Sequence, residues 1–114
     1  MKRNPKKYLF DMLDACQFLL AMTQGKSIKD YKTDRIFRSA IERELQIIGE
    51  ALRQLESVAP QVAKRVPEHE RIIRFRHVIV HGYDTVKPQS VWEVIEDKLE
   101  PLRVALQRML DDEE

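Results

Sequence analysis

A chain of 114 residues with 43% hydrophobic and 34% charged residues is long enough for one domain with its own core and too short for two. The formal net charge of +1 excludes attraction of nucleic acid by the whole surface, so any such binding needs a local patch. The single cysteine, Cys16, excludes an intrachain disulfide. No long apolar run or signal-peptide pattern is present, so we expect a cytoplasmic protein without a membrane segment.

Three glycines and five prolines are too few for a sheet with many tight turns, which favours an all-α fold. From Lys6, apolar residues recur at helical spacing, and this pattern predicts a first helix that ends at Gly25. Cys16 lies on the apolar face of this helix, so we expect it in the core rather than acting as a nucleophile. The basic segment 1–7 and the acidic segment 111–114 are expected to fray.

A long second helix is predicted over residues 33–58, after a loop, with Thr33 as a better start than a cap made by Ser27 and Asp30. Gly49, in the middle of this helix, costs about 1 kcal/mol relative to alanine and indicates close approach of another helix. The apolar face comprises Ile36, Phe37, Ala40, Ile41, Ile47, Ile48, Ala51, Leu52 and Leu55.

Proline and glycine mark the limits of two further helices. Pro67, followed by acidic residues, predicts the start of a third helix that ends at Gly82. Pro88 opens a fourth helix, in which Pro101 predicts a kink or break near residues 98–100. Its buried stripe comprises Val91, Trp92, Ile95, Leu99, Leu102, Leu106 and Met109. The sequence therefore predicts one domain, residues 1–114, folded as an up-and-down four-helix bundle.

Arg76 interrupts the apolar stripe of the third helix. In a helix over residues 71–81, Ile72, Phe75 and Ile79 share one side, and Arg76 falls near its centre. An unpaired buried charge costs several kcal/mol, so Arg76 must meet a carboxylate inside the fold or line a seam between two chains. Glu44 occupies a similar position on the second helix, and a Glu44–Arg76 pair is one hypothesis. Alternatively, Glu44 faces a second chain, or the assigned face is wrong by one turn.

Arg76, His81 and Tyr83 form an R-x4-H-x-Y pattern. Histidine transfers protons near neutral pH and arginine clamps phosphate, which together suffice for RNA cleavage without a metal. Five residues of helix separate Arg76 and His81 by about 140°, so they converge only at a helix end or where two chains meet. The bare pattern is common, and a structural role for His81 remains an alternative. Tyr83 could be a core aromatic, a stacking surface for a base or a modifiable hydroxyl.

A metal site and a basic patch are two further interpretations. His77 and His81 have the i, i+4 spacing of two ligands on one helix face, and they share a neighbouring face with Arg74. The glutamate of H-E-x-x-H is absent and no cysteine lies nearby, so we expect neither a metal nor another cofactor. The basic residues Lys64, Arg65, Arg71 and Arg74 are either a solvated face or an RNA-binding patch.

The segment RFRHVIVHGYD resembles the R-x4-H-x-Y signature of HepT-like toxins, a branch of the HEPN superfamily of helical ribonucleases. Residues 41–52 (IERELQIIGEAL) are similar to the second-helix segment of that family. Residues 91–102 (VWEVIEDKLEPL) resemble its fourth-helix segment, with the same interrupting proline. The resemblance extends from about residue 33 to 102.

The resemblance implies a homodimer that brings two motifs into one basic cleft and cleaves RNA without a metal. It also implies a toxin–antitoxin pair, in which a nucleotidyltransferase antitoxin of MntA type transfers AMP to the motif tyrosine. Arg76 would then hold the scissile phosphate, His81 would act as acid and base, and Tyr83 would accept AMP. His77 stands where the family more often has asparagine. The alternative is a non-catalytic helical module that binds a nucleotide or a partner helix.

Overall fold

The computed structural model describes residues 4–112, which form helices joined by short connections, without strands. The first helix, α1 (Pro5–Met22), is capped by Asn4, whose side chain accepts a hydrogen bond of 2.9 Å from the backbone N–H of Lys6. Residues 5–7 are therefore helical rather than frayed. At the other end of the chain, residues 111 and 112 are also helical. The remainder of both predicted tails, residues 1–3 and 113–114, lies outside the described residues.

A short helix, α2 (Ile28–Thr33), occupies most of the region predicted as a loop. Ser27 and Asp30 do form a cap, but of this short helix and not of the long one: the backbone N–H of Ser27 donates to the Asp30 carboxylate at 2.8 Å. Tyr31 packs α2 against the rest of the fold. Its ring is buried 6.4 Å from the ring of Trp92, and its hydroxyl donates to Glu42 at 2.6 Å.

The long helix α3 (Arg35–Val58) begins one residue after Asp34, whose side chain accepts hydrogen bonds from the first-turn amides. The predicted start at Thr33 was wrong because the Asp34 carboxylate caps this helix. Ile36, predicted on the buried face, is 84% exposed. Leu45, absent from that predicted face, is buried. The buried stripe of α3 therefore begins at Phe37 and includes Leu45.

The connection to the third long helix contains α4 (Pro60–Ala63), which was not predicted. The third helix, α5 (His69–His81), starts two residues after Pro67, because the chain first turns through a left-handed conformation at Glu68 (φ 56°). Gly82 ends α5 as predicted. Its φ of −125° shows that this end does not use the left-handed glycine conformation expected there.

The fourth helix of the bundle is built from three consecutive segments. A 3-10 turn, η1 (Tyr83–Thr85), leads to α6 (Pro88–Glu93), which opens at the predicted proline. The π-helical turn η2 (Val94–Lys98) then joins it to α7 (Leu99–Asp112). Because proline lacks an N–H, a local change in the hydrogen-bond ladder near Pro101 is expected, and the π turn lies just before that residue. All seven residues of the predicted stripe are buried.

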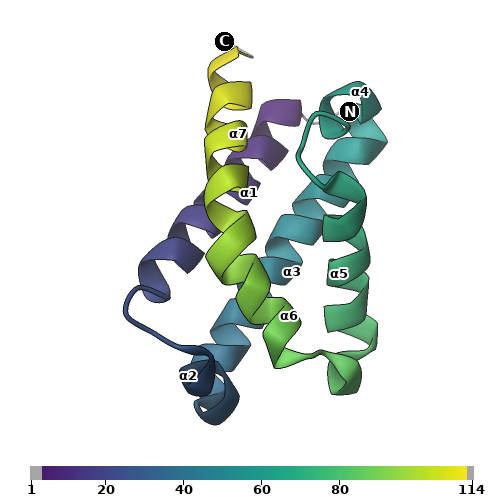
Figure 1. Cartoon of the computed structure of the whole chain (residues 1–114). Coiled ribbons are helices and arrows are strands. Elements are labelled where there is room, and N and C mark those ends of the chain that lie inside the picture. The colour runs from purple at the N-terminus through teal and green to yellow at the C-terminus, as the bar shows by residue number, and fades with distance from the viewer. Residues whose placement is uncertain (1–3, 113–114) are drawn as a thin grey trace.

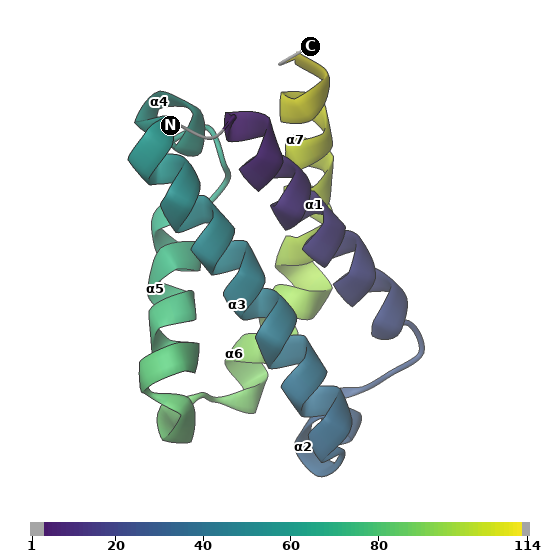
Figure 2. The same ribbon diagram turned by 180° about the vertical axis from the view of Figure 1, so that it is seen from behind.

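The helices α1, α3, α5 and α6–α7 form the predicted four-helix bundle. The central helix α3 packs against α1 and α5, and α1 also packs against α7 (Figures 1 and 2). Cys16, in the middle of α1, is fully buried as predicted. Within residues 4–112, no helix combines the length and the apolar character needed to cross a membrane.

Candidate active site on α5

Arg76 crosses α3 directly over Gly49. A Cβ atom added to Gly49 would lie 2.6 Å from Cγ of Arg76 and still closer to its Cβ. Only glycine leaves room for the arginine stem at this crossing. The predicted close approach of another helix at Gly49 is confirmed, and the helix is α5.

The carboxylate that meets Arg76 belongs to Glu50, the residue after that glycine. Nη2 of Arg76 lies 2.9 Å from Oε2 of Glu50, and the two side chains are 20% and 44% exposed. The hypothesis of a Glu44–Arg76 pair is therefore wrong. Glu44 lies six residues earlier on α3, about 9 Å along the axis and on another side of the helix.

The Arg76 guanidinium keeps unused hydrogen-bonding capacity. Its Nε atom is buried without a hydrogen-bond partner among the described residues. The contact with Glu50 is close enough for an ion pair, but its geometry does not make a hydrogen bond to Oε2. Because guanidinium carries five N–H donors in a planar fork, Arg76 retains donors suited to an anion.

Two histidine side chains lie together near the end of α5. The rings of His77 and His81 have centroids 4.7 Å apart and planes inclined by 49°, and both residues are exposed. Within the described part of the chain, neither ring has a hydrogen bond or an ion pair. His69, at the other end of α5, instead lies 3.0 Å from the carboxylate of Glu56.

The single chain does not bring Arg76 and His81 together. Arg76 packs against α3, whereas His81 is exposed to solvent at the last residue of α5. This arrangement matches the angular separation expected for five residues of helix. The backbone of Tyr83 opens η1 just beyond Gly82, but its side chain lies outside the described residues.

The four residues of the predicted basic patch lie at different places. Lys64 and Arg65 follow α4, and Arg65 lies 3.6 Å from Asp112, at the end of the molecule opposite the C-terminus of α5 (Figure 1). Arg71 is held by Glu68 at 2.6 Å. Of the four, only Arg74 is an exposed cation on the same face of α5 as the histidine pair.

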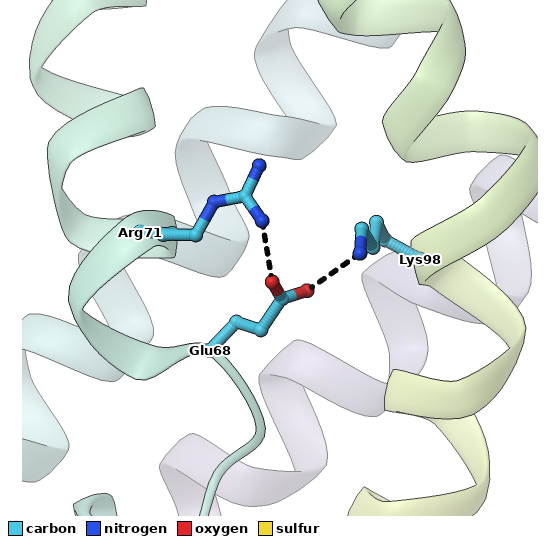
Figure 3. Close-up of polar contacts among 3 residues, drawn as sticks. All are labelled: Glu68, Arg71 and Lys98. Carbon is cyan, nitrogen blue, oxygen red and sulfur yellow. Dashed lines mark hydrogen bonds and ion pairs between the residues drawn. The ribbon is translucent and has the colours of Figure 1, made fainter.

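An open groove between α5 and α6–α7 was not anticipated from the sequence. It has a volume of about 550 Å³, and Leu45 and Ile48 of α3 are among its lining residues. Glu68 spans the groove, contacting both Arg71 and, at 3.4 Å, Lys98 (Figure 3). The apolar stripe of α5 is the sequence feature that could have indicated this groove. Other helices cover the stripe only in part, because Ile79 is its one buried member.

The described residues contain no group of three or more His, Cys, Asp or Glu side chains arranged to hold a metal ion. The histidine pair thus has two nitrogen ligands to offer and no third side chain of these types nearby within residues 4–112.

Comparison with known proteins gives one consistent result. Residues 12–109 match the model of the family described as ribonuclease HepT-like. A protein of Caldanaerobacter subterraneus subsp. tengcongensis named "Putative RNase TTE0752" is 31% identical over 97% of this chain and 98% of its own length. The "Probable ribonuclease HepT" of Thermococcus cleftensis is 26% identical over 96% of this chain and 98% of its own length. No solved structure matches.

An all-α bundle that carries Arg76 and His81 of the R-x4-H-x-Y motif on its third long helix, with Tyr83 just beyond the end of that helix, is the HEPN type of helical domain. The chain belongs to the ribonuclease HepT-like family of that superfamily.

Proposed function

We propose that this protein is an endoribonuclease that cleaves RNA without a metal ion. The observation that carries the proposal is the family match, which spans the motif residues Arg76, His81 and Tyr83 and includes relatives named as RNases. In the proposed reaction the 2′-hydroxyl of RNA attacks the adjacent phosphate. His81 transfers protons, and Arg76 holds the phosphate and stabilises the charge that develops on it.

The proposal includes a homodimer, because one chain keeps its Arg76 and His81 on different sides of α5. Two chains related by a twofold axis would place Arg76 of one beside His81 of the other, at a shared phosphate. The Arg76 side chain keeps 20% of its surface exposed, which supports access of an anion to it, whereas its Nε atom is buried and does not contribute.

We further propose that the protein is the toxin of a toxin–antitoxin pair and acts in the cytoplasm, where its RNA substrates are. The antitoxin would be an MntA-type nucleotidyltransferase that transfers AMP to Tyr83. Tyr83 follows His81 after a single glycine, so an added AMP would bring negative charge and bulk next to the reacting groups. Repulsion between this charge and an RNA backbone would silence the enzyme.

A second candidate is a non-catalytic binding module. The groove between α5 and α6–α7 favours it, because this hollow is large enough for a small ligand or for side chains of a partner helix. Binding in the groove would not require His81.

The His81→Ala variant, made without the antitoxin, distinguishes the two. We expect wild-type protein to stop growth and to degrade RNA in the presence of EDTA, and we expect the variant to do neither. Equal behaviour of the two proteins would favour the binding module. Intact mass after incubation with the nucleotidyltransferase and ATP tests the modification: wild type should gain the mass of AMP, and Tyr83→Phe should not.

A further inference from the structure

Three residues line one exposed stripe of α5: Arg74, His77 and His81. At about 100° per residue, their side chains leave the helix within about 60° of one another. All three are exposed, and the two imidazole rings lie 4.7 Å apart. Arg76 leaves α5 on a different side, toward α3. We call these three residues the Arg74–His81 stripe.

Other arginines and histidines of α5 are paired with carboxylates, whereas the three residues of the Arg74–His81 stripe are not. Arg71 contacts Glu68 and Arg76 contacts Glu50, whereas Arg74 has no ion pair or hydrogen bond within residues 4–112. In the same way, His69 contacts Glu56, and the described chain supplies no polar partner to the other two histidines. Unpaired cationic and proton-transferring groups on one face are suited to bind an anion.

We propose that the Arg74–His81 stripe binds the scissile phosphodiester, and that His77 and His81 divide the base and acid roles between them. The inference deepens the ribonuclease activity proposed above and rests on it. It adds His77 as a catalytic residue and Arg74 as an anchor for the phosphate, to which Arg76 of the partner copy can add a second clamp. The asparagine more frequent at the position of His77 cannot exchange protons in this way.

The proposed step balances without a cofactor. One neutral imidazole takes the proton of the 2′-hydroxyl while the 2′-oxygen–phosphorus bond forms. The bond from phosphorus to the 5′-oxygen breaks, and the other imidazole, protonated beforehand, gives its proton to that oxygen. The products are a 2′,3′-cyclic phosphate and a 5′-hydroxyl, and exchange with water restores the starting protonation of both rings.

The surroundings of the stripe suit this chemistry. Glu50, a carboxylate of α3 near this part of α5, is committed to Arg76, and Glu42 accepts from Tyr31. Arg74 also lines the groove beside α5, where Glu93 and Asp97 are acidic lining residues, and no ion pair within residues 4–112 joins either of them to Arg74. Asp84 of η1 is exposed.

Binding is tested with an RNA oligonucleotide that carries 2′-O-methyl groups and therefore cannot be cleaved. We expect Arg74→Ala to weaken binding about tenfold and to lower the salt slope of the affinity by about one. Arg71→Ala is the matched control, because its guanidinium is occupied by Glu68 one turn away, and it should change binding less than twofold. Equal losses in the two variants would overturn the role of Arg74.

Proton transfer is tested by kinetics in EDTA on two RNA substrates, one ordinary and one with sulfur in place of the 5′-bridging oxygen. The sulfur leaving group needs no general acid. We expect His77→Asn and His81→Asn each to lose about 10²- to 10⁴-fold on ordinary RNA, and the thio substrate to rescue one of them but not the other. His69→Asn is the control and should keep wild-type rates on both substrates.

The outcomes separate this inference from the function on which it rests. Cleavage by wild type with an unaffected His77→Asn variant would overturn the inference alone. Rescue of both variants, or of neither, would also overturn the division of roles. Absence of any cleavage by wild type would overturn the ribonuclease proposal itself. The side chains of Arg71, Arg74, His77 and His81 are exposed, and that of His69 is 17% exposed. Unchanged thermal unfolding of each variant confirms that it is folded.

Discussion

Gly49 sets the distance between α3 and α5, and therefore the position of Arg76. We expect Gly49→Ala to destabilise the protein by about 1–3 kcal/mol, because the new methyl group overlaps the arginine stem and α5 must shift. The same shift should reduce RNA cleavage. Thermal unfolding and kcat/KM measure the two effects.

Ser39→Ala is the control for this substitution, since Ser39 is an exposed residue of the same helix. It should change stability by less than about 0.5 kcal/mol. A Gly49→Ala protein as stable and as active as wild type would show that α5 tolerates displacement and that Arg76 needs no close contact with α3.

The partial burial of Glu44 makes the folding stability of the protein depend on pH. Partial burial, and then the nearby charge of Asp14, raise the pKa of Glu44 above its usual value. A carboxyl group with a raised pKa in the folded state favours folding at low pH and loses that contribution as pH rises through the folded pKa. Ionised Glu44 is therefore a small cost at neutral pH.

We expect Glu44→Gln to raise the thermal midpoint at pH 7. The rise corresponds to an increase in the free energy of unfolding on the order of 0.5 kcal/mol. The difference from wild type should disappear as pH falls toward 4, where wild-type Glu44 takes up its proton. Glu96→Gln, on an exposed site of η2, is the control. A constant difference between Glu44→Gln and wild type at all pH values would contradict the assigned cause.

At the scale of the elements, α1 packs into the core through an apolar stripe that includes Cys16, the single cysteine of the chain. Cys16 is fully buried, and burial raises the pKa of its thiol to about 12. The reactive thiolate is therefore almost absent at pH 8. We expect no reaction of native protein with a thiol reagent, and complete reaction in denaturant. Rapid labelling of the native protein would show that α1 leaves the bundle easily.

The short helices α2 and α4 lie at the two ends of the long helix α3. α2 is held by its own cap and by the buried Tyr31, which bonds to Glu42 and packs near Trp92. α4 begins with Pro60, which follows Ala59, the C-cap residue at the end of α3. Both helices are shorter than a pattern of helical periodicity needs to become visible, so the sequence predicts loops in their place.

For the whole molecule, the central question is whether Arg76 and His81 act across two chains. Arg76→Ala and His81→Ala proteins should each be inactive as homodimers. In a mixed dimer, one of the two sites then contains an intact arginine from one chain and an intact histidine from the other. We expect the mixture to recover up to about a quarter of wild-type activity, since random pairing makes about half the dimers mixed.

The readout is RNA cleavage after the two variants are unfolded and refolded together, and sedimentation reports the mass of the assembly. A mixture of wild type with His81→Ala provides the reference for dimer exchange. Recovery should vanish if both substitutions are placed in the same chain. No recovery from a mixture that demonstrably exchanges subunits would mean that each chain uses its own two residues.

The sequence by itself determined that Cys16 lies on the inner face of α1, which residues of α6–α7 are buried, where α5 ends, and that a charge at Arg76 required a partner. These features follow from local periodicity and chain stereochemistry, which act within a few turns of one helix. The R-x4-H-x-Y pattern was equally local. Only the tertiary structure decided that Glu50 rather than Glu44 meets Arg76, that the predicted basic patch is divided, and that a groove opens beside α5. Those outcomes depend on the offset and crossing of helices far apart in the chain, and a shift of one turn between two helices changes which side chains meet.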